Sequence, residues 1–157
     1  MKRFAIVVTV IVAIACAALT WLLTVQAEQT VRPSLEGLDS KTATIAGNQL
    51  EVYLAVTSEQ RTTGLSHTKV LPTGSGMLFD MQRKGILSIW MKDMHFAIDI
   101  IWLDEQLKVV HIEHQVSPDT YPTTFKNPAE RPASYVLEIN GGQANALGIE
   151  LGSQLTL

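Results

Sequence analysis

The sequence predicts a mainly β protein: an antiparallel barrel- or sandwich-like single domain with one or two short helices, preceded by an N-terminal transmembrane or signal helix. Three observations lead to this fold class. Short runs with an apolar residue at every second position recur from residue 42 to the C-terminus. Regular alternation of strands and long helices is absent. The first residues form a long apolar run. We therefore expect an anchor or signal peptide over 1–27, a tether over 28–41 and a β-rich domain over 42–157.

The N-terminal segment begins with Lys2 and Arg3 and contains no further charge before Glu28. An apolar run of about 20 residues can span a bilayer as a helix, and basic residues before it keep the N-terminus in the cytoplasm. A cleaved signal peptide is the alternative, because VQA at 25–27 resembles a cleavage site. A lipoprotein cysteine at Cys16 is a third. Each places the domain outside the cytoplasm, as a single-pass membrane protein facing the periplasm or extracellular space, or as a secreted protein if the segment is cleaved.

Several classes of function are disfavoured by composition. The formal net charge is −3 and no basic run follows the first three residues, so nucleic-acid binding has no electrostatic support. Cys16 is the only cysteine, which leaves the domain without disulfides or thiolate ligands. Neither glycine-rich phosphate-loop pattern occurs. The sequence predicts no cofactor.

The β-rich domain divides into short predicted elements. Gly47-Asn48 separates two alternating runs, which indicates a hairpin. Thr57 and Gln60 form a capping box that starts a short helix ending at Gly64. Further strands are predicted over 76–81, 85–93, 98–104, 107–115 and 134–140, with a helical turn in GGQANALGI and a last strand in GSQLTL. A loop rich in proline lies between residues 116 and 134.

Five motifs follow one another along the chain: RTTGLS at 61–66, GMLF at 76–79, IWMKDMHFAIDIIWLD at 89–104, SYVLEING at 134–141 and the closing ALGIELGS. In this order the chain resembles the domain of unknown function family 192. The resemblance implies an exported or membrane-anchored protein with a mainly β, barrel-like domain, and it supplies no activity. The chain departs from the usual pattern at Ser153, where Asp is common, and at Asp93, where many relatives have Asn. It also lacks the cysteines that some relatives carry near SPDTYP.

The candidate ligand site is built around Trp90 and Lys92. On one strand face, the Lys92 stem can lie over the Trp90 ring while its ammonium group seeks an anion. Asp99 and Glu138 are the available carboxylates, and an unpaired buried ammonium is costly. We therefore predict a pocket of these four residues, with Asn140 as an amide donor. The alternative is that Lys92 and Asp99 form a pair that only stabilises the fold, with Trp90 in the core.

Metal binding and enzymatic chemistry have weaker support. His111 and Glu113 share a strand face while His114 points away, and two ligands are too few for zinc. No metal site is predicted. Asp99 and Glu138 could divide acid and base roles, but no nucleophile-elbow pattern occurs.

The sequence therefore favours a membrane-tethered binding or accessory module at the cell envelope. Its partner would be a small polar ligand or an envelope protein, bound near Lys92 and the proline-rich loop. A carboxylate-based hydrolase or lyase is one alternative, and a purely structural envelope component is another. Whether the protein is an enzyme stays open, with the balance against it.

Overall fold

The computed structural model of the protein describes residues 35–157. The predicted membrane or signal segment, residues 1–27, and the first half of the predicted tether lie outside these residues. Within residues 35–157, no helix is both long enough and apolar enough to cross a membrane.

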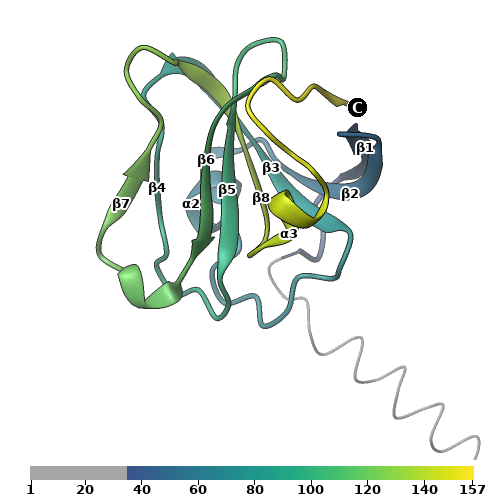
Figure 1. Cartoon of the computed structure of the whole chain (residues 1–157). Helices are drawn as coiled ribbons and strands as arrows, with labels where there is room; N and C mark the ends of the chain where they lie inside the picture. Colours follow the sequence, from purple (N-terminus) through teal and green to yellow (C-terminus); the bar gives the residue numbers. More distant parts are fainter. Residues whose placement is uncertain (1–34) are drawn as a thin grey trace, which may run out of the picture. The chain divides into compact units, whose positions relative to one another are not determined.

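A curled seven-stranded sheet forms most of the domain, and a two-stranded ribbon lies against it (Figure 1). The sheet order is β6-β5-β8-β3-β2-β1-β9, and the ribbon pairs β4 with β7. The strands are β1 Ser40–Ile45, β2 Asn48–Ala55, β3 Ser75–Gly85, β4 Ser88–Trp90, β5 Ile98–Leu103, β6 Val109–Val116, β7 Thr124–Lys126, β8 Ala133–Asn140 and β9 Leu155–Thr156, and the helices are α2 Ser58–Thr63, α3 Gln143–Ala146 and the single 3₁₀ turn η1 Pro118–Thr120.

The mainly β class and the two short helices are confirmed. Antiparallel pairing connects all neighbouring strands except β2 and β3, which are parallel. A parallel pair requires a crossover connection, and here the chain crosses over through α2. The Thr57 side chain accepts a hydrogen bond from the Gln60 N–H, and the Gln60 side chain accepts one from the Thr57 N–H. The predicted capping box therefore forms. Strand β7 is new, because its sequence reads as part of the proline-rich loop.

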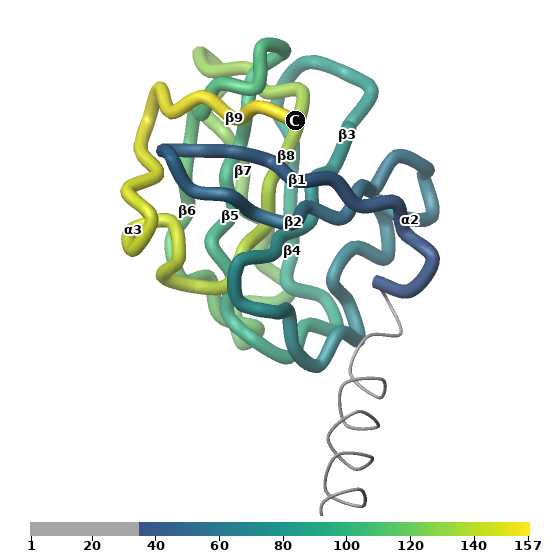
Figure 2. Tube along the Cα trace, turned by 90° about the vertical axis from the view of Figure 1, so that its right-hand side faces the viewer, coloured from purple at the N-terminus to yellow at the C-terminus, as the bar shows by residue number. Residues whose placement is uncertain are grey.

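The C-terminal segment joins the two edges of the curled sheet. Strand β9 pairs with β1, while Gln154 bridges to Lys108 beside the start of β6. The Leu155 N–H donates to the Leu107 carbonyl at 2.9 Å. Figure 2 shows this segment running from α3 across to β1. The open side of the half-barrel is thereby bridged, which protects backbone groups at both edges.

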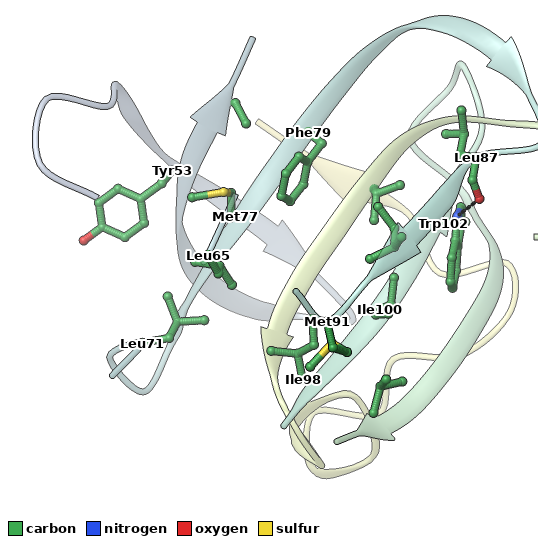
Figure 3. Packing of buried hydrophobic residues seen from close by; sticks show 14 of the residues in the cluster. Tyr53, Leu65, Leu71, Met77, Phe79, Leu87, Met91, Ile98, Ile100 and Trp102 are labelled. Atoms are coloured by element: carbon green, nitrogen blue, oxygen red, sulfur yellow. Dashed lines mark hydrogen bonds between the residues drawn. The ribbon is translucent and has the colours of Figure 1, made fainter. Parts of the chain in front are cut away.

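Both faces of the sheet are buried. The ribbon-side cluster lies between the sheet and the segments around α2 and β4; Figure 3 shows many of its members, among them Met77, Phe79, Leu87, Ile100 and Trp102. The tail-side cluster packs the other face and includes Ile101, Leu103, Leu137, Ile139 and Leu155. All six residues of β5 are buried. Successive side chains on β5, and on β8 from Tyr135 onward, therefore alternate between the two faces of the sheet.

Gly76 in β3 provides a test of this packing. An added Cβ would lie 2.8 Å from the Glu138 carbonyl oxygen and 2.8 Å from Ile139 Cγ2. We expect Gly76→Ala to destabilise the domain by about 1–3 kcal/mol, because β8 must move away. Urea unfolding measures the effect.

Gly74→Ala is the comparison variant. Its added Cβ meets nothing within 4 Å, so only the positive φ of 77° is strained, at a cost of about 1–2 kcal/mol. A Gly76→Ala protein as stable as the wild type would show that β3 and β8 are not packed this closely.

Candidate functional site

A pocket opens on the ribbon side of the sheet. It has an empty volume of about 450 Å³, including the part that opens to solvent. Apolar side chains form much of its wall, hydroxyl groups and Arg61 add polarity, and Glu138 contributes a carboxyl group. The described lining residues are Arg61, Thr62, Thr63, Gly64, Leu65, Ser66, Phe79, Met81, Ser88, Ile89, Trp90, Met94 and Glu138.

Glu138 is the unusual member of this lining. It lies in the middle of β8, opposite Met77 and Ile100 on the neighbouring strands, and is only 5% exposed. Directly paired residues share a sheet face, so its side chain enters the ribbon-side cluster. Among residues 35–157, none makes a hydrogen bond or ion pair with its carboxyl group. Burial raises the pKa of Glu138 to about 8, and the group is mostly protonated at neutral pH.

One wall of the pocket is the turn that follows α2. Gly64 ends the helix with a φ of 51°, and its N–H donates to the Gln60 carbonyl at 2.8 Å. A Cβ at this position would lie 3.2 Å from the Phe79 ring. Glycine therefore allows the chain to turn tightly against β3, which brings Leu65 and Ser66 to the pocket.

Arg61 holds this wall in place. Its Nη1 donates to the carbonyl oxygens of Val56 at 2.6 Å and Asp80 at 3.0 Å. These bonds connect α2 to the end of β2 and to β3. The guanidinium group forms no ion pair with a described carboxylate, so its charge does not neutralise Glu138.

The rim carries exposed aromatic rings. Trp90 is 47% exposed, and its ring centroid lies 6.2 Å from that of Tyr121 in an edge-on arrangement. The Lys92 Nζ lies 5.8 Å from the Trp90 ring centroid, so the predicted contact between this lysine and the indole is present. Ser66 Oγ donates to the Lys92 carbonyl at 2.9 Å, which joins the α2 turn to the rim.

The predicted ion pair of Lys92 is wrong. Lys92 is exposed and forms no ion pair with Asp99 or Glu138. The reason is that Ser88 and Trp90 form the exposed face of β4, with Ile89 buried between them, so the face on which Lys92 was predicted does not point into the sheet. The two carboxylates are also separated: Asp99 pairs with Ile139 of the tail-side cluster, on the opposite face from Glu138.

Asp99 stabilises the fold through hydrogen bonds to backbone N–H groups. It is fully buried and accepts hydrogen bonds from the N–H groups of Gln115 at 2.8 Å, Gly142 at 3.0 Å and Ala144 at 2.7 Å. These bonds hold α3 and the end of β6 against β5. The predicted alternative, a Lys92–Asp99 pair with Trp90 in the core, is therefore also wrong: backbone amides hold Asp99, and Trp90 is exposed.

Asn140 likewise supports the fold. Its Nδ2 donates to the Leu71 carbonyl at 2.9 Å, which fixes the loop between α2 and β3. Of the five predicted site residues, the structure brings Trp90 and Glu138 to the pocket, with Lys92 beside the rim and Asp99 on the other face. Sequence reasoning missed the α2 turn, because its glycine was interpreted only as a helix end. Glu138 was predicted only as an available carboxylate for Lys92, whereas the acid inside the apolar run of SYVLEIN is the signal that could have singled it out.

Three histidines lie within 4.0 Å of a carboxylate: His67 near Asp93, His111 near Glu113 and His114 near Asp99. His111 Nε2 lies 3.1 Å from Glu113 Oε1. The centroid of the His111 ring lies 5.2 Å from that of the Trp102 ring. Within the described part of the chain, no group of three or more His, Cys, Asp and Glu residues is placed to hold a metal ion.

The family model of the domain of unknown function family 192, DUF192, described as Uncharacterized ACR, matches residues 41–157. The chain belongs to this family. The match covers every described residue that lines the pocket. No match was found among curated proteins.

Two solved structures are similar to this DUF192 chain. A Novosphingobium aromaticivorans DSM 12444 protein of unknown function is 29% identical, with a TM-score of 0.73, covering 81% of this chain and 91% of that one. A Sinorhizobium meliloti 1021 protein that has been suggested to be a transcription regulator is 26% identical, with a TM-score of 0.70, covering 76% of this chain and 94% of that one.

The Asp99 environment predicts a large loss of stability on substitution. In Asp99→Asn an amide NH₂ group replaces one acceptor, so at least one buried N–H loses its partner. We expect about 2–4 kcal/mol of destabilisation, since hydrogen bonds to charged groups contribute about 1.5–3 kcal/mol each. Urea unfolding at neutral pH measures it, and an Asn variant as stable as the wild type would contradict the structural role.

Replacing Glu138, in contrast to Asp99, is expected to raise stability at higher pH. Its folded pKa of about 8 lies above the unfolded value near 4.5, so the folded state binds more protons between these values and stability falls as pH rises. Above pH 8 both states are ionised and the effect is constant. In Glu138→Gln this dependence disappears. We expect the variant to gain on the wild type by up to about 1.4 kcal/mol per pH unit between pH 5 and 8, measured by urea unfolding across that range.

Proposed function

We propose that this domain is a small-ligand-binding module, and that its ligand occupies the pocket over Glu138. The observation that carries the proposal is a buried carboxyl group, without a partner among the described residues, at a pocket that opens to solvent. Ligand sites typically combine apolar walls with a few polar groups that orient the ligand.

The energetic argument concerns why an acid is present at this position. A buried polar group without a hydrogen bond costs free energy, and an ionised one costs several kcal/mol more. An apolar residue would fill the same space in β8 without that penalty. Perturbed acids in clefts are therefore enriched at functional sites, and a role in binding accounts for Glu138 better than a role in packing.

The hydrolase or lyase alternative has less support. Paired-carboxylate chemistry needs a second acid near the first, and Asp99 lies on the opposite face of the sheet. Glu138 is the sole acid among the described pocket residues. The regulatory role suggested for the Sinorhizobium relative would fit a ligand sensor, but the net charge of −3 argues against direct contact with nucleic acid.

We also propose that the module works at the cell envelope, held there by residues 1–27. The support is the apolar N-terminal run after two basic residues. A partner protein of the envelope would then contact the exposed rim. A purely structural role would not explain why an acid is buried at position 138.

Blocking the pocket tests the binding function. Ser88 is exposed and lines the pocket, so Ser88→Trp places a large ring at its entrance. A panel of small cationic, anionic and neutral compounds would be screened by thermal shift and NMR. We expect at least one compound to bind the wild type and to lose at least tenfold in affinity with Ser88→Trp.

Thr42→Trp is the matched control, because Thr42 is an exposed strand residue in β1 that does not line the pocket. It should bind like the wild type. If every bound compound tolerates Ser88→Trp, the ligand site lies elsewhere.

A further inference from the structure

We propose that the pocket selects a small organic cation, such as an ammonium or guanidinium group on a short apolar body, whose charge meets the Glu138 carboxylate. This inference rests on the proposed function and adds the chemical class of the ligand. It follows from the charges that face Glu138 and from the apolar wall around it.

The first step is the set of groups around the carboxyl. Strand β3 presents Met77 and Phe79, β5 presents Ile100, and the α2 turn presents Leu65. None of these side chains is charged. The carboxylate form of Glu138 therefore lacks a counter-ion on each of these sides.

The second step concerns the nearby cations of the protein. Arg61 is the other charged group among the described lining residues, and its Nη1 is bonded to two backbone carbonyls. Lys92 lies over the exposed Trp90 ring. Burial alone raises the pKa of Glu138, and neither cation lowers it. A ligand cation at the carboxyl would supply the positive charge that the described residues do not.

The third step is the shape and chemistry of the wall. Leu65, Phe79, Met81, Ile89 and Met94 surround the space next to Glu138. A strongly hydrated inorganic cation gains little from such a surface. An amine with a short alkyl or aromatic body can bury its apolar part there and can contact the Trp90 ring at the rim.

The binding step must release a proton near neutral pH. Free Glu138 is protonated there, so the balanced reaction is COOH plus R–NH₃⁺ giving COO⁻···⁺H₃N–R plus H⁺, and the buffer takes the proton. Affinity for a cation should therefore rise about tenfold per pH unit below pH 8 and then level off. An anion that binds beside the protonated acid would keep a constant affinity below pH 8 and lose affinity above it, and a neutral ligand would show little dependence below pH 8.

The experiment uses the full chain in detergent micelles and three probes with one body: benzylamine, benzyl alcohol and benzoate. NMR titrations at pH 6, 7 and 8 give the affinities. Calorimetry in phosphate and in HEPES at pH 7 gives the number of protons released. We expect benzylamine to bind most tightly, with the tenfold slope and close to one proton released.

Glu138→Gln and Ser88→Trp distinguish the possible results. Glu138→Gln should weaken benzylamine at least tenfold and abolish the pH slope, while benzyl alcohol changes little. If benzoate or benzyl alcohol binds more tightly than benzylamine, and Ser88→Trp abolishes this binding, the proposal of a cationic ligand is contradicted. The proposal of a ligand pocket would still stand. Benzylamine binding without pH dependence would also overturn the cation. If no probe and no compound of the panel binds in a way that Ser88→Trp reduces, both proposals fail.

Discussion

Burial of both faces of the central strands constrains everything else in this domain. Every side chain of β5 is buried, and so are most of those of β8, so a polar group on these strands is satisfied only by partners inside the protein. Asp99 satisfies this requirement, and Glu138 does not. Asp99 accepts three backbone N–H bonds and ties α3 and β6 to β5. Glu138 has no such donors among residues 35–157, and it lies where the ribbon-side layer leaves a pocket.

The pocket depends on segments that are distant in sequence. The α2 turn forms one wall, and β4 with Met94 forms another. Hydrogen bonds across this boundary hold the two together: Ser66 donates to the Lys92 carbonyl, and the His67 N–H donates to the Asp93 carbonyl at 2.8 Å. The site therefore lies between the rigid sheet and the layer that covers it. Its walls are fixed by backbone contacts, while the Trp90 and Tyr121 rings at the rim are exposed.

Membership of the DUF192 family and the two similar structures agree on the fold, and the fold does not determine the function. The case for ligand binding comes from one site and its chemistry. A carboxyl group that is buried without a partner is unfavourable for the empty protein, and a ligand that completes its environment would relieve this cost.

Much of this protein is determined by the sequence alone. Period-two runs predict the strands other than β7, the Thr57–Gln60 box predicts α2, and Glu138 is named as a candidate site residue. Local patterns act over a few residues, so they also show that Trp90 and Lys92 lie close together. Only the tertiary structure decided which cluster each strand face enters, and hence that Asp99 and Glu138 are on opposite faces. It also decided that β4 ends before Lys92 and that the α2 turn completes the pocket. Strand pairing and the covering of a face depend on contacts between distant segments, which residue spacing along one segment does not specify.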